Sequence, residues 1–116
     1  MERTTGILLP IFSLPSNQGI GDFGKHTYRL IDAIAKQHIH IWQILPLNPV
    51  GYGNSPYQPY SSFAGDELYI SIDTLADYGL LKQSSIRNYN KFSERVDYEG
   101  VRKFKEPYLR KAFKTF

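Results

Sequence analysis

The sequence predicts an α/β fold built around one strand–helix–strand unit. Residues 6–10 and 39–45 are short apolar runs, each closed by a proline, as is typical of strands buried in a parallel sheet. Between them, apolar residues recur at steps of three and four, which indicates an amphipathic helix. Strand, helix and strand in this order form a βαβ unit, whose two strands run parallel.

The composition limits the classes of protein to which this chain can belong. Its 116 residues, 41% hydrophobic and 22% charged, are typical of a globular chain, and this length supports at most one domain. The sequence contains no cysteine, which excludes a disulfide framework, an iron–sulfur site and a thiol nucleophile. No apolar run near the start reaches the ~20 residues of a membrane span, so we expect a cytoplasmic protein without a membrane partner.

Local residue types justify each element of the first half. After the first strand, residues 11–21 predict a loop because turn-forming residues concentrate there. Asp22 is placed to cap the following helix, whose apolar stripe continues to His38 at its C-terminal end. Residues 39–45 are rich in β-branched and aromatic side chains and predict the second strand. We expect both strands to be buried on both faces.

The second half begins with a long loop and continues with helices. Residues 46–65 carry four prolines and three glycines, and loops of this length are usually functional. Asp73 is expected to cap a short helix that Gly79 ends. Residues 101–116 predict a last helix, in which Pro107 should cause a kink or a break.

The net charge of +3 comes from this last helix. Residues 1–100 hold 8 basic and 10 acidic side chains, whereas residues 101–116 hold 6 basic and 1 acidic. The apolar stripe of the helix comprises Val101, Phe104, Tyr108, Ala112 and Phe116, and the expected opposite face carries Arg102, Lys103, Lys105, Arg110, Lys111 and Lys114. We interpret the basic residues as a solvated helix face and expect no nucleic-acid partner.

Three patterns suggest a cofactor, a metal or a catalytic pair, and none is complete. GIGDFG at residues 19–24 fits a dinucleotide-binding pattern, but a loop separates it from the first strand, and no carboxylate ends the second strand. His38 and His40 lack a third metal ligand nearby. Asp66 and Glu67 are neighbours, which face opposite ways on an extended segment. We expect no cofactor, no metal and no complete active site.

The long loop has a composition that suits sugar binding. Tyrosine rings offer flat apolar faces to a pyranose, while Asn54, Ser55 and Gln58 supply short neutral donors and acceptors for hydroxyl groups. The prolines stiffen the loop, so less entropy is lost on binding. Alternatively, the tyrosines only pack the loop onto the body of the protein. Composition alone leaves both interpretations open.

Several segments resemble, in the same order, the N-terminal part of the 4-α-glucanotransferases, the amylomaltases of glycoside hydrolase family 77. These segments are residues 6–16 (GILLPIFSLPS), 19–24 (GIGDFG), 42–47 (WQILPL), 51–58 (GYGNSPYQ), 61–65 (SSFAG) and 79–81 (GLL). The resemblance implies a (β/α)8 TIM barrel, of which this chain would be an incomplete N-terminal portion. Residues 1–48 would form the first βαβ unit, and residues 49–116 an inserted substrate-loop and helical subdomain.

The resemblance also implies an activity and a binding site. The family transfers α-1,4-glucan segments between maltooligosaccharides by a retaining double displacement. Tyr57 would stack on or hydrogen-bond the sugar next to the nucleophile, Ser55 and Gln58 would hold hydroxyl groups, and Tyr52 and Asn54 would add contacts. The family's three catalytic carboxylates belong to later parts of its chain, and none of their motifs occurs here. We therefore expect a fragment that supplies donor-sugar binding only.

Three other functions stay open at this stage. They are an α-amylase-type glycoside hydrolase fragment, a non-catalytic maltooligosaccharide-binding remnant, and a nucleic-acid binder that uses the basic helix. Two barrel strands by themselves would leave an open edge and an uncovered apolar face. We therefore expect the isolated chain to be poorly soluble or to have a fluctuating fold.

Overall fold

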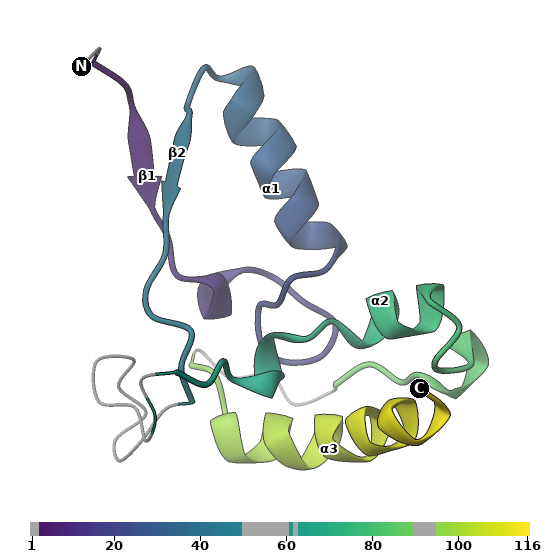
Figure 1. Cartoon of the computed structure of the whole chain (residues 1–116). Coiled ribbons are helices and arrows are strands. Elements are labelled where there is room, and N and C mark those ends of the chain that lie inside the picture. The colour runs from purple at the N-terminus through teal and green to yellow at the C-terminus, as the bar shows by residue number, and fades with distance from the viewer. Residues whose placement is uncertain (1–2, 50–60, 62, 90–94) are drawn as a thin grey trace.

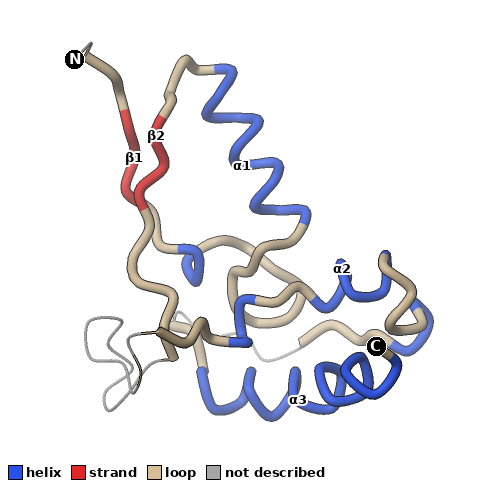
Figure 2. The backbone as a smooth tube through the Cα atoms, viewed as in Figure 1, coloured by secondary structure: helices blue, strands red, loops and turns tan. Residues whose placement is uncertain are grey.

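The computed structural model describes residues 3–49, 61, 63–89 and 95–116. In chain order, its strands and α-helices are β1 (Gly6–Leu8), α1 (Lys25–Lys36), β2 (Ile41–Gln43), α2 (Ile72–Asp77) and α3 (Tyr98–Thr115). Short 3-10 helices lie at η1 (Ile11–Ser13), η3 (Glu67–Tyr69) and η4 (Gln83–Ser85). Figure 1 shows β1, β2 and α1 in one half of the molecule and α2 and α3 in the other, and Figure 2 shows the long loop segments that connect the halves.

The βαβ unit is confirmed as two parallel strands joined through α1. Gly6 pairs with Ile41 and Leu8 pairs with Gln43. The Leu9 amide continues the ladder by donating to the Gln43 carbonyl at 3.0 Å. The Trp42 indole N–H donates to the Leu9 carbonyl at 2.9 Å, which ties β2 to the segment that follows β1. The two strands therefore end side by side at the same edge.

The expectation that both strands are buried on both faces is wrong. The side chains of Leu8 and Ile41 are 60% and 49% exposed. Large side chains of α1 are exposed too, for example Tyr28 at 62%. Parallel strands become buried only where helices cover both faces of the sheet. In the described part of the chain, helices do not cover both faces of the sheet formed by β1 and β2. Its exposed apolar side chains match the uncovered face that the sequence analysis anticipated.

Two helix starts differ from the prediction. Gly24, not Asp22, is the N-cap of α1, and no side chain caps this helix. Ser71, not Asp73, caps α2, because its hydroxyl accepts the Thr74 amide at 3.3 Å. A hydroxyl directly before the helix reaches this amide, whereas Asp73 already lies in the first turn.

Two helix ends lie where the sequence placed them. Gly79 ends α2 at φ +81°, and the Leu80 amide donates back to the Leu75 carbonyl at 3.0 Å. His38 follows α1 at φ 59°, a left-handed conformation that is uncommon outside glycine. Backward bonds of this kind satisfy the last carbonyl groups of a helix. Both helices therefore end in the same way, and His38 serves as a terminator.

The last helix runs without interruption from Tyr98 to Thr115, so of the predicted kink or break near Pro107, the break does not occur. Buried residues on both sides of the proline, including Val101 and Ala112, hold the two halves of α3 against the rest of the protein. Packing of this kind offsets the hydrogen bond that proline removes. Phe116 does not belong to the buried stripe, since it is 92% exposed.

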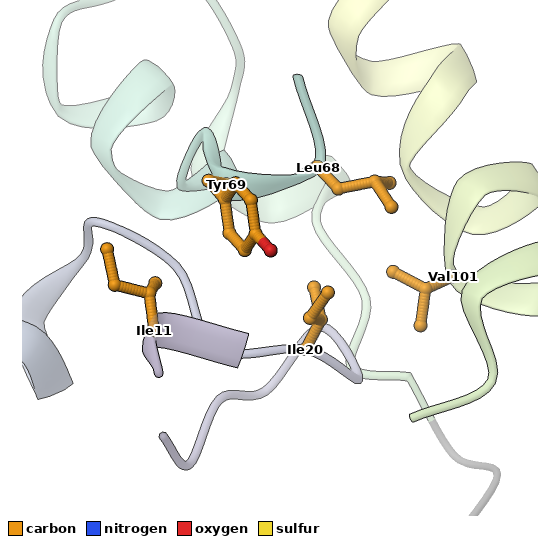
Figure 3. Close-up of a cluster of buried hydrophobic side chains, with 5 residues drawn as sticks. All are labelled: Ile11, Ile20, Leu68, Tyr69 and Val101. Atoms are coloured by element: carbon orange, nitrogen blue, oxygen red, sulfur yellow. The ribbon is translucent and has the colours of Figure 1, made fainter. Parts of the chain in front are cut away.

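The core lies between the loops and α3 rather than on the sheet. One cluster joins Ile11 and Ile20 from the segment after β1, Leu68 and Tyr69 from η3, and Val101 from α3 (Figure 3). A second cluster joins α2 and its following turn to α3 and comprises Ile72, Ala76, Leu81 and Ala112. The segments that follow the two strands are therefore held by helix α3, which comes later in the sequence.

Candidate functional site

The candidate site lies beyond the C-terminal ends of β1 and β2. Residues 9–22 leave β1 at this edge, and residues 44–49 leave β2 at the same edge. In α/β proteins with parallel strands, ligand sites form on the loops at this edge. The predicted sugar-binding residues, Tyr52, Asn54, Ser55, Tyr57 and Gln58, lie outside the described residues. The structure does place the residues on both sides of them.

The two flanks of this segment are hydrogen-bonded to each other. The Asp66 amide donates to the Leu47 carbonyl at 2.7 Å. The Asn48 side-chain amide donates to the Ala64 carbonyl at 2.9 Å. We call these four residues the loop base. The loop base fixes the points at which the chain leaves β2 and returns to the core.

Asp66 of the loop base and its neighbour Glu67 have a structural role. The Asp66 carboxylate accepts the Leu68 amide at 3.0 Å and so caps η3. Arg102 of α3 contacts both carboxylates, with one nitrogen 3.3 Å from Asp66 Oδ2 and another 2.6 Å from Glu67 Oε1. As neighbours in the sequence, Asp66 and Glu67 are unsuited to act as an opposed catalytic pair. Their shared arginine instead connects the start of η3 to α3.

A buried lysine lies at the other end of η3. The Lys105 ammonium is fully buried and lies 2.7 Å from the Leu68 carbonyl, 3.0 Å from the Ile70 carbonyl and 3.4 Å from Asp22 Oδ2. The prediction that Lys105 lies on the solvated basic face is therefore wrong. The spacing held a signal, because Lys105 is four residues after Val101 and three before Tyr108. It therefore lies within the apolar stripe.

The basic face of α3 is weaker than the sequence suggested. Lys105 is buried, Arg102 contacts Asp66 and Glu67, and Arg110 contacts Glu106 at 2.6 Å. Half of the six basic residues counted for this helix are thus engaged with groups of the protein itself. This arrangement gives less support to a nucleic-acid site than the bare charge count did.

Asp22 is a buried carboxylate and not a helix cap. Its Oδ1 accepts the Gly24 amide at 3.0 Å, and the Thr27 hydroxyl donates to its carbonyl oxygen. Burial raises the pKa of Asp22 above its ordinary value of 3.8, and the neighbouring Lys105 offsets part of this effect. Burial also lowers the pKa of Lys105, with Asp22 opposing the shift. Desolvation thus favours the neutral form of each group.

The raised pKa of Asp22 predicts a pH dependence of stability. A carboxyl group with a raised pKa in the folded state contributes stability below its unfolded pKa, and this contribution is lost as the pH rises through the folded pKa. We expect the free energy of unfolding of the wild type to fall relative to Asp22→Asn as the pH rises above 3.8. The decrease is about 1.4 kcal/mol for each unit by which the pKa is raised.

Urea unfolding followed by circular dichroism over a pH series measures this difference. The negative charge of Asp73 also raises the pKa of Asp22, so Asp73→Asn serves as the control for this through-space electrostatic effect. It should reduce the pH dependence without removing it. Parallel stability curves for the wild type and Asp22→Asn would show that the carboxyl group titrates normally.

The glycine-rich motif packs the core and is not positioned like a phosphate-binding turn. A side chain at Gly21 would lie 1.8 Å from the Ile11 carbonyl oxygen, and Ile20 is buried in the first cluster. Gly19 has a φ of +83°, which other residues rarely adopt. These glycines let the chain fold back onto η1. The interpretation as loop glycines fits this arrangement.

A hollow opens beside the loop base. Its volume is about 330 Å³, and its lining includes Leu47 and Asp66 together with three aromatic residues, Phe23, Tyr69 and Tyr78.

Among the described residues, no group of three His, Asp or Glu side chains could hold a metal ion. No helix in the same part of the chain is both long and apolar enough to span a bilayer.

Comparisons with known proteins agree on one family. A family model described as 4-alpha-glucanotransferase matches residues 9–116. The 4-alpha-glucanotransferase of Synechocystis sp. is 44% identical over 99% of this chain and 23% of the relative's length, and that of Aquifex aeolicus is 42% identical over 98% and 24%. The amylomaltase from Streptococcus agalactiae in complex with acarbose matches the structure with a TM-score of 0.90 at 37% identity, covering 99% of this chain and 24% of that one. The chain spans about a quarter of the length of these relatives.

Proposed function

Because this chain belongs to the 4-alpha-glucanotransferase family, glycoside hydrolase family 77, we propose that it supplies donor-sugar binding for the transfer of α-1,4-glucan segments between maltooligosaccharides. The match of the family model to residues 9–116 carries this proposal. The similar amylomaltase was solved with acarbose, which supports a glucan as the ligand. We place this reaction in the cytoplasm, in maltose or starch metabolism.

The proposed site consists of Tyr52, Asn54, Ser55, Tyr57 and Gln58. Tyr57 stacks on or hydrogen-bonds the donor sugar, Ser55 and Gln58 hold hydroxyl groups, and the other two residues add contacts further along the glucan. The position of the loop base supports this assignment, because the segment leaves and rejoins the described chain at the C-terminal edge of β1 and β2. This is the edge at which barrel enzymes bind substrates.

We further propose that the two parallel strands are the first two of a (β/α)8 barrel. Residues 1–48 then form its first βαβ unit, and residues 49–116 an insertion that carries the substrate loop and the helices. The exposed apolar residues of β1, β2 and α1 support this proposal, since barrel strands are covered on both faces.

The reaction needs groups beyond those of the proposed site. In a retaining transfer, a carboxylate attacks the sugar and forms a covalent glycosyl intermediate, while an acid protonates the leaving oxygen. The 4-hydroxyl of a second sugar then displaces the carboxylate in place of water. The tyrosine and the amide and hydroxyl side chains proposed here would hold and orient the donor sugar, which lowers the entropic cost of the first step.

A disproportionation assay tests the proposed function. The complete product of the gene that encodes this chain is incubated with maltotriose, and the products are separated by chromatography. Two molecules of maltotriose should give glucose and maltopentaose, with longer oligomers following. Shortening without longer products would identify a hydrolase. Calorimetric binding of maltoheptaose without any new product would identify a sugar-binding remnant.

A further inference from the structure

The two ends of η3 are held by two cations of the same helix. At its start, Arg102 of α3 contacts Asp66 and Glu67, at 3.3 and 2.6 Å. At its end, Lys105 donates to the Leu68 and Ile70 carbonyls, at 2.7 and 3.0 Å. The two cations are three residues apart and therefore lie on neighbouring positions of one helix face. Helix α3 thus holds η3 at both ends.

The polar contacts of Lys105 exceed what packing alone requires. Burying an ammonium group costs several kcal/mol unless its hydrogen bonds are satisfied. Lys105 is fully buried, and its three N–H groups have three acceptors within 3.4 Å. A methionine would fill a similar volume without this desolvation cost. The ammonium group therefore supplies connections that an apolar side chain does not.

These connections lead to the loop base. The Asp66 amide, at the N-cap of η3, donates to the Leu47 carbonyl at 2.7 Å. A shift of η3 moves this amide and therefore moves the point at which the chain returns from residues 49–65. Lys105 also contacts Asp22 in the segment after β1, at 3.4 Å, which is the longest of its three contacts. Two of its three contacts, and the two shortest, are therefore with the Leu68 and Ile70 carbonyls at the end of η3.

We propose that Lys105 is a positioning residue, which sets the geometry of the loop base and through it the affinity for a maltooligosaccharide. It acts without touching the sugar. This inference rests on the proposed function, because it concerns the loop to which sugar binding is assigned. Lys105 belongs to α3, outside that loop, yet sugar binding by the loop depends on it.

Three variants separate this role from a general contribution to stability. Lys105→Met removes the bonds to both carbonyls. Asp22→Asn removes the counter-charge and keeps both of these bonds, although it also leaves a buried charge unpaired and lowers stability. Lys103→Met removes an exposed lysine of the same helix and serves as the matched control.

Amide hydrogen exchange and calorimetry with maltoheptaose provide two independent measurements on the complete product of the gene that encodes this chain. We expect Lys105→Met to raise exchange at residues 66–70 about tenfold, to leave α1 unchanged, and to weaken maltoheptaose binding about tenfold. Lys103→Met should stay within about twofold of the wild type in both measurements, whereas Asp22→Asn should keep its affinity within about twofold and raise exchange at residues 66–70 less than Lys105→Met does. The inference is overturned if Lys105→Met keeps both values, or if Asp22→Asn loses as much affinity as Lys105→Met.

Lys105→Gln covers the case in which Lys105→Met does not fold. Its amide nitrogen lies one bond closer to the backbone, so it falls short of the carbonyls without removing every donor. Exchange at residues 66–70 should rise in this variant too, and unchanged exchange and affinity would contradict the inference. If the wild type binds no maltoheptaose, the proposed sugar binding fails. The exchange contrast between the Lys105 and Asp22 variants still decides whether Lys105 positions η3.

Discussion

Tyr57→Ala is expected to weaken maltoheptaose binding by about 10- to 100-fold, which corresponds to about 1.4 to 2.8 kcal/mol. A tyrosine ring offers a flat apolar face and a polar tip, and truncating such a residue at the centre of a binding site commonly costs this much. The loss should appear in the dissociation constant from calorimetry. In the disproportionation assay it should lower the rate at low maltotriose concentration.

Two control variants define what Tyr57 contributes. Tyr57→Phe keeps the ring and removes the hydroxyl, so it separates stacking from hydrogen bonding. Tyr28→Ala removes a tyrosine that is 62% exposed on α1 and should leave binding unchanged. If Tyr57→Ala binds maltoheptaose within twofold of the wild type but unfolds at a lower urea concentration, the tyrosine packs the loop and does not bind sugar.

Gly21→Ala is expected to destabilise the fold by about 3 kcal/mol or more. The added Cβ would lie 1.8 Å from the Ile11 carbonyl oxygen and 2.8 Å from the Leu14 amide nitrogen. These are backbone atoms at the two ends of η1, so they cannot rotate away as a side chain would. A domain of this size has a net stability of only about 5–15 kcal/mol, and such a loss removes much of it.

Gly65→Ala is the matched control, because no heavy atom lies within 4 Å of its added Cβ. We expect its stability to stay within about 0.5 kcal/mol of the wild type. Urea unfolding followed by circular dichroism compares the two variants directly. Equal stabilities for Gly21→Ala and Gly65→Ala would show that Gly21 is not packed against the backbone of η1 as described.

Local sequence patterns predicted the elements whose causes are local. The three- and four-residue period located α1, and the apolar runs located β1 and β2 and their parallel pairing. Gly79 was assigned to the end of α2 from its residue type alone, and its φ of +81° confirms that assignment. In each case the deciding interaction lies within a few residues of the pattern.

Three of the errors concern residues whose surroundings depend on distant parts of the sequence. Asp22 was assigned as a cap because its local position allows it, yet its ionic partner is 83 residues away. Lys105 was assigned to solvent because it is charged, although its spacing lies within the apolar stripe of α3. The burial of β1 and β2 depends on layers that a strand's own residues do not reveal. The composition of the loop suggested the residues assigned to sugar binding, the resemblance to a family gave their roles, and both remain a prediction.

The contacts by which Arg102 and Lys105 of α3 hold η3 also bear on the order of folding. Arg102 and Lys105 reach partners 35 to 83 residues earlier in the chain. During synthesis, β1, α1 and β2 leave the ribosome well before these two cations do, and contacts of long sequence separation form slowly. The contacts of α3 with η3 and Asp22 therefore form late in synthesis. Until α3 emerges, the carboxylates of Asp22 and Asp66 stay hydrated, and η3 lacks the two cations that hold its ends.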